Sequence, residues 1–150
     1  MSRRYCSEDA EFLLEVLDLH PGMSILAIDP EVASSEAVGE RVGRGGRVRV
    51  APSAAGAPAR CGRHEQFDRI YAMRVPDFRS DVPAVAALAP LLAACGQLWV
   101  IDRAGVGEGT GTVSLTVSTV LAQAGFAIVD ILERGSQVAV WAAIGHRNHG

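Results

Sequence analysis

Short apolar runs alternate with helical patterns along almost the whole chain, and this alternation constrains the fold more than any other feature. The apolar runs predict strands at 23–28, 67–73 and 96–101. Helical spacing of apolar residues predicts helices at 7–19, 31–42, 81–95 and 113–124. Because parallel strands need crossover connections, which are usually helical, this order favours a mostly parallel α/β sheet.

The remaining strands predict the two ends of the sheet. Segments 126–132 and 137–144 are separated by four residues, a connection short enough for an antiparallel hairpin. In segment 46–50 two valines alternate with Arg47 and Arg49. A central strand is covered on both faces, so this alternation predicts an edge strand.

Length and composition predict one domain over residues 1–150. Hydrophobic residues make up 49% of the 150 and charged ones 21%, enough for a sizeable core. The three cysteines form no CxxC pair, and no apolar stretch is long enough to span a membrane. The N-terminus turns acidic where a signal peptide would need an apolar stretch. We therefore expect reduced thiols, a cytoplasmic location and no membrane partner.

The charge pattern argues against nucleic acid as a partner. The net charge is −3, and all 14 basic residues are arginines. Six of them fall close together, at positions 41, 44, 47, 49, 60 and 63. No aromatic residues interleave with them, so a solvated edge and loop is the favoured interpretation.

Five segments in order resemble class I S-adenosylmethionine-dependent methyltransferases. They are LLEVLDLHPGMSILAID, AVGERVGRGGRVRV, FDRIYAMRVPDF, LAPLLAACGQLWVIDR and LAQAGFAIVDI. The resemblance covers nearly the whole chain. It implies a Rossmann-like methyltransferase sheet, mostly parallel, with a C-terminal antiparallel hairpin.

The positions that hold the cofactor in that family depart from its pattern. The acidic residue of the first strand is replaced by Ala27, and the glycines that follow are replaced by Asp29, Glu31 and Ala33. The acid that holds the ribose at the end of the second strand is replaced by Ala51. Glycine lets a ligand approach the backbone closely, so these replacements predict that no cofactor binds in the usual way.

The segment between the second and next predicted strands is also short. The family places a helix, a third strand and another connection there, whereas residues 51–66 offer sixteen positions. We expect the third strand to be missing, in agreement with the edge character of segment 46–50.

Candidate site residues lie where the parallel strands end, because open α/β sheets bind ligands at that edge. These crevice candidates are Asp29, Glu31, Arg74, Asp77, Asp102 and Arg103. In an active enzyme Asp77 or His64 would be the general base; the alternative is a cap or surface role for each. Cys61 and His64 have metal-like spacing without a second pair, so no metal is expected. Segment 105–112 lacks the Lys-Ser/Thr of a phosphate loop and is interpreted as a flexible connection.

Three functions remain open. The leading hypothesis is a non-catalytic accessory or scaffold subunit that forms a homo-oligomer or a complex with an active methyltransferase. The second is an active small-molecule methyltransferase of a biosynthetic pathway, with S-adenosylmethionine as cofactor. The third is a protein that binds a small molecule in the crevice, or catalyses another reaction there.

Overall fold

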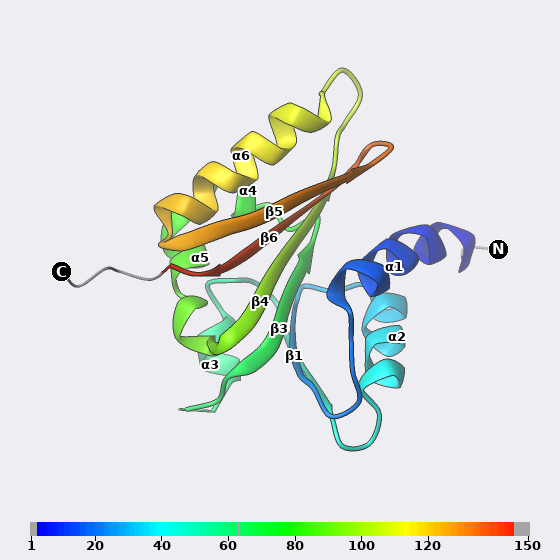
Figure 1. Ribbon diagram of the computed structural model, residues 1–150, viewed down its shortest axis with the longest axis vertical. Coiled ribbons are helices and arrows are strands. Elements are labelled where there is room, and N and C mark those ends of the chain that lie inside the picture. Colours follow the sequence, from blue (N-terminus) through cyan, green and yellow to red (C-terminus); the bar gives the residue numbers. More distant parts are fainter. Residues whose placement is uncertain (1–2, 63, 146–150) are drawn as a thin grey trace.

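The computed structural model describes residues 3–62 and 64–145, with side chains from Ala10 onward, and within them the chain forms one six-stranded sheet (Figure 1). The strands are β1 (Ser24–Ile28), β2 (Arg47–Ala51), β3 (Phe67–Met73), β4 (Leu92–Arg103), β5 (Phe126–Arg134) and β6 (Gln137–Ile144). Their order is β2-β1-β3-β4-β6-β5. The first four are parallel, β6 is antiparallel to β4, and β5 is antiparallel to β6. The mostly parallel sheet with a terminal hairpin is confirmed.

Helices cover both faces of this sheet and bury two apolar clusters. On one face lie α1 (Arg3–Leu17) and α2 (Val32–Val42), which pack on β1, β3 and β4. On the other lie α3 (Ala57–Arg60), α4 (Asp77–Ser80), α5 (Val82–Ala86) and α6 (Thr110–Gln123). Figure 1 shows α6 running along the β5–β6 hairpin. Among the described residues, no helix has both the length and the hydropathy that crossing a bilayer requires.

The edge position of β2 and the missing strand are both confirmed. In the described part of the connection from Ala51 to Phe67, the short helix α3 is the only regular element. The arginines of β2 are ion-paired with Glu65, at 2.6 Å for Arg47 and 2.9 Å for Arg49. Hydrogen bonds from the Gly62 N–H and from Arg49 hold the pKa of Glu65 below its ordinary value.

The predicted helix over 81–95 is wrong in its second half. Asp81 does cap α5, because its Oδ1 accepts the Ala84 N–H at 3.1 Å. The helix then stops at Ala86, a 3-10 turn follows at Ala89–Leu91, and β4 begins at Leu92. Pro90 lies inside the predicted helix and has no N–H to donate to it. The residues from Leu92 onward pair with β3 instead.

Two helices begin earlier than predicted. Helix α1 begins at Arg3 rather than at residue 7, and α6 begins at Thr110 rather than at 113. The glycine-rich connection before α6 is tethered, because the Glu108 carboxylate accepts the Gly105 N–H at 3.0 Å. It is therefore less flexible than its composition predicts.

Candidate functional site

The carboxyl ends of β1 and β3 meet at the place where open α/β sheets bind ligands. Asp29 directly follows β1 and Arg74 directly follows β3, and both have left-handed backbones, with φ of 43° and 54°. Glycine adopts this conformation without penalty. The turn after β1 thus keeps the backbone conformation of a glycine while it presents an aspartate side chain.

Contacts within the chain link the segments around this crevice. The Glu31 carboxylate lies 4.0 Å from the Arg74 guanidinium, and both side chains are about half exposed. Asp77 accepts the Ala54 N–H through its Oδ2 at 3.1 Å. Since β2 and β3 flank β1 on either side, this hydrogen bond joins the loop after β2 to the first residue of α4, which follows β3.

The end of β2 is closed by small apolar residues. Ala51 and Ala54 are completely buried, and the Ala51 carbonyl accepts the Asp29 N–H at 2.7 Å. Ala27, in the middle of β1, is also completely buried and packs in the cluster beneath α1 and α2. None of these three alanines presents a polar side chain to the crevice.

The two candidate general bases lie at opposite edges of the sheet. His64 is exposed and precedes the amino end of β3, whereas Asp77 follows its carboxyl end. A strand of seven residues is roughly 20 Å long, so the two side chains cannot serve one reaction centre.

Burial raises the pKa of the Cys61 thiol, which is close to His64 in the sequence. Within residues 3–62 and 64–145, no group of three or more His, Cys, Asp or Glu side chains could hold a metal ion.

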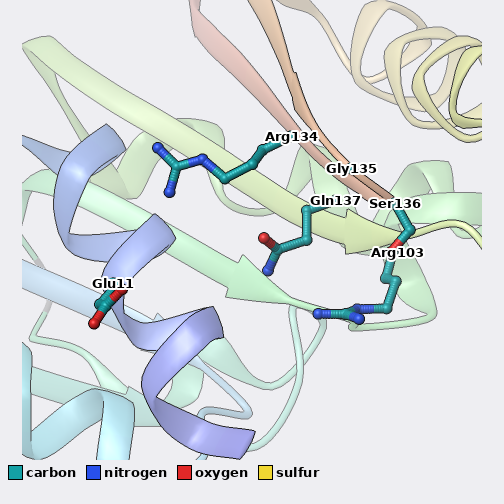
Figure 2. Close-up of a pocket in the computed structure, with 6 residues that line it drawn as sticks. All are labelled: Glu11, Arg103, Arg134, Gly135, Ser136 and Gln137. Carbon is teal, nitrogen blue, oxygen red and sulfur yellow. The ribbon is translucent and has the colours of Figure 1, made fainter.

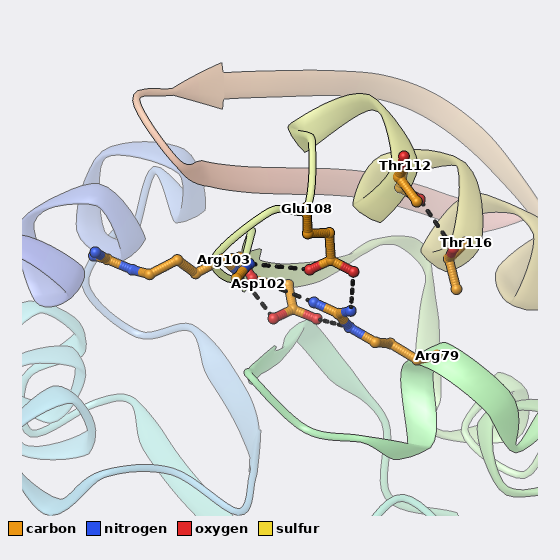
Figure 3. A network of polar contacts seen from close by, with 7 residues as sticks. Arg79, Asp102, Arg103, Glu108, Thr112 and Thr116 are labelled. Atoms are coloured by element: carbon orange, nitrogen blue, oxygen red, sulfur yellow. Dashed lines mark hydrogen bonds and ion pairs between the residues drawn. The ribbon is translucent and has the colours of Figure 1, made fainter.

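Asp102 and Arg103, adjacent in β4, point to opposite faces of the sheet. Asp102 is nearly buried and accepts a hydrogen bond from Arg79 Nε at 2.8 Å (Figure 3). The same guanidinium donates to Glu108 at 3.0 Å. These two carboxylates raise the pKa of Arg79, which therefore stays charged. The network ties β4, α4 and the connection before α6 together, so Asp102 has a structural role on this face.

The Arg103 side chain instead lines a pocket of about 400 Å³ on the face that α1 covers (Figure 2). The pocket residues are Glu11, Arg103, Arg134, Gly135, Ser136 and Gln137. Four of them come from the turn of the β5–β6 hairpin, which the sequence did not single out. The predicted topology held a signal for them, because this hairpin turn lies at the same edge as the carboxyl end of β4.

Comparison with known proteins finds similarity in structure only. No protein-family model and no curated protein sequence matches the chain. A putative methyltransferase from Haloferax volcanii, solved in complex with the Trm112 methyltransferase activator, matches with a TM-score of 0.70 and 11% identity over 99% of this chain and 96% of that one.

Two further solved structures agree with that match. An S-adenosylmethionine-dependent methyltransferase from Aquifex aeolicus has a TM-score of 0.67 and 16% identity over 89% of this chain and 88% of that one. Fibrillarin from Aeropyrum pernix, with natively bound S-adenosyl-L-methionine, has a TM-score of 0.63 and 17% identity over 91% and 74%. Together with the sheet order and the terminal hairpin, these matches show that the chain has the Rossmann-like fold of class I S-adenosylmethionine-dependent methyltransferases.

Proposed function

We propose that this protein is a non-catalytic, methyltransferase-like accessory or scaffold subunit of the cytoplasm that does not hold S-adenosylmethionine in the usual way. The observation that carries the proposal is the hydrogen bond from the Ala54 N–H to Asp77 across the carboxyl end of β1. It links the segments that follow β2 and β3, the strands on either side of β1, and a ligand of this fold would lie near the carboxyl end of β1.

The residues around that edge also fit the cofactor poorly. The methionine part of S-adenosylmethionine approaches the backbone closely at the family's glycines, whereas Asp29 and Glu31 bring side chains to these positions. At the end of β2 the buried Ala51 offers no carboxylate to the ribose hydroxyls. Both halves of the usual site therefore lack the groups that would bind it.

A scaffold subunit needs a surface for a partner, and β5 offers the best candidate. It is an edge strand with exposed Val129, Ile131 and Leu132. A register shift at Val129 interrupts its ladder, and the Asp130 carboxylate accepts the Ile131 N–H at 2.8 Å. Bulges and occupied N–H groups discourage the addition of another strand. Because Ile131 and Leu132 are adjacent in β5, they point to opposite faces of the sheet. We propose that a second copy, or an active methyltransferase, packs on the face that carries Leu132.

Isothermal titration with S-adenosylhomocysteine tests the cofactor half of the proposal. We expect no saturable heat at ligand concentrations up to about 1 mM, corresponding to binding weaker than about −4 kcal/mol. Micromolar binding would overturn the proposal. It would favour the alternative of an active methyltransferase, which a search for methyl transfer in the host extract would then pursue.

Light scattering on the protein, alone and as purified from its own host, tests association. Leu132→Asp should dissociate the complex, because it places a charge in the contact. Val106→Asp is the matched control, since Val106 is fully exposed in the connection before α6. A monomer at about 100 μM that copurifies with no methyltransferase would contradict the scaffold role.

A further inference from the structure

We infer that the pocket between α1 and the β5–β6 turn binds a small oxyanion, a phosphate monoester or a carboxylate, that also carries a hydroxyl or ammonium group. This ligand site is separate from the crevice at the ends of β1 and β3. It does not depend on whether S-adenosylmethionine binds there.

The donors around the pocket fit an oxyanion. Figure 2 shows Arg103, Arg134 and Gln137 directed into the space between the hairpin and α1. Ser136 lines the same space. Gln137 is only 8% exposed, so little of this polar side chain is in contact with solvent. Guanidinium groups bind carboxylates and phosphates strongly, because two parallel N–H donors match two oxygens.

The backbone around Arg103 is held rigidly from the opposite face of the sheet. Its N–H donates to Asp102 Oδ1 at 2.8 Å, and its carbonyl accepts from Arg79 Nη2 at 3.3 Å. The Ala104 N–H donates to the Ser136 carbonyl at 2.8 Å, which fixes the hairpin turn against β4. Figure 3 shows the Arg103 side chain leaving this network toward α1. Binding therefore requires little ordering of the backbone, which favours affinity.

The acidic residues of α1 define the rest of the ligand. Glu15 is ion-paired with Arg134, whose guanidinium also lies 5.0 Å from the centre of the Phe12 ring. Glu11, one turn earlier on α1, is the acidic residue that lines the pocket itself. A bare anion would be repelled by Glu11, whereas a ligand with a hydroxyl or ammonium group can donate a hydrogen bond to it.

The test titrates ¹⁵N-labelled protein with three related compounds and follows the Gln137 side-chain amide and the Ser136 backbone amide. Glycerol phosphate and glycerate share hydroxyl groups and differ in their oxyanion, and glycerol lacks the anion. We expect saturable shifts with at least one of the two anions and none with glycerol. The stronger anion identifies the ligand source. No saturable shift with either anion, or equal shifts with glycerol, would overturn the inference.

Variants assign the site to these residues. Arg103→Gln should weaken anion binding at least about tenfold, since it removes charge-assisted hydrogen bonds. Arg103→Lys should retain part of the affinity, and an unchanged spectrum elsewhere shows that each variant is folded. Glu11→Gln should strengthen the binding of inorganic phosphate by removing repulsion. Arg60→Gln, an equal charge change on the exposed end of α3, is the control. If it weakens binding as much as Arg103→Gln, the pocket is not the site.

Discussion

Replacing Asp102 with asparagine should destabilise the protein by about 2 kcal/mol. The Asp102 side chain is 10% exposed and that of Arg79 is 31% exposed, and their ion pair measures 2.8 Å. A hydrogen bond to a charged group contributes about 1.5–3 kcal/mol, and breaking a fully buried pair costs about 3–5 kcal/mol. Because Arg79 is about one-third exposed and keeps Glu108, the lower range applies. For a chain of this length we expect the melting temperature to fall by about 4–8 °C.

Urea unfolding of the wild-type protein and two variants measures this free energy. Asp130→Asn is the matched control, because Asp130, like Asp102, accepts the N–H of the next residue at 2.8 Å. Asp130 is exposed, and its hydrogen bond with the Ile131 N–H involves no guanidinium. The difference between the two variants therefore isolates the contribution of Arg79. The usual error of additivity between mutations is about 0.5 kcal/mol. If the free energies of unfolding of the two variants differ by less than this, the Arg79 network does not stabilise the fold.

Further predictions concern Tyr71, two glycines and Asp77. Burial raises the pKa of Tyr71 from 10.0 to about 12. Stability should therefore be unaffected below about pH 10 and fall by about 3 kcal/mol as the pH rises to 12, because the unfolded chain loses this proton first. Unfolding of Tyr71→Phe at pH 9 and 11.5 checks this, and a variant as alkali-sensitive as the wild type would contradict it. Gly96→Ala should cost about 2 kcal/mol, since a Cβ there would lie 2.9 Å from the Phe67 carbonyl oxygen. In the same assay Gly39→Ala should stabilise α2 by about 0.5–1 kcal/mol, as its Cβ would meet nothing within 4 Å. Asp77→Asn should cost about 1 kcal/mol and speed amide exchange in the loop after β2, whereas unchanged exchange would show that the loop is held by other contacts.

Much of the fold could be predicted because its strands are buried on both faces. The run at Phe67–Met73 has the same boundaries in the sequence and in the structure, and almost all of its residues are buried. The helix prediction for the second half of 81–95 failed because alanine-rich segments have high helix propensity whichever structure they adopt. Pairing of Leu92 and the following residues with β3 overrides that propensity, and single-sequence patterns do not reveal such pairing.

The candidate site was predictable only in part. Glu31 and Arg74 do lie together at the ends of β1 and β3, as expected from the parallel order. Asp102 and Arg103 were expected in the same crevice, but strand alternation sends them to opposite faces. That separation was available from the sequence. The pocket around Gln137 was predictable only in part, because the topology places the hairpin turn beside the end of β4 but does not show where α1 packs.

The single carboxylate at the β2 edge carries a lesson for shortening α/β proteins. Removing an outer strand exposes a row of unpaired backbone groups that invites aggregation. Here Glu65, reached through a short excursion of the chain, draws Arg47 and Arg49 into fixed positions along that edge. A designer who trims a Rossmann-like sheet could protect the new border in the same way, with alternating cations on the strand and one anion returned from the following loop.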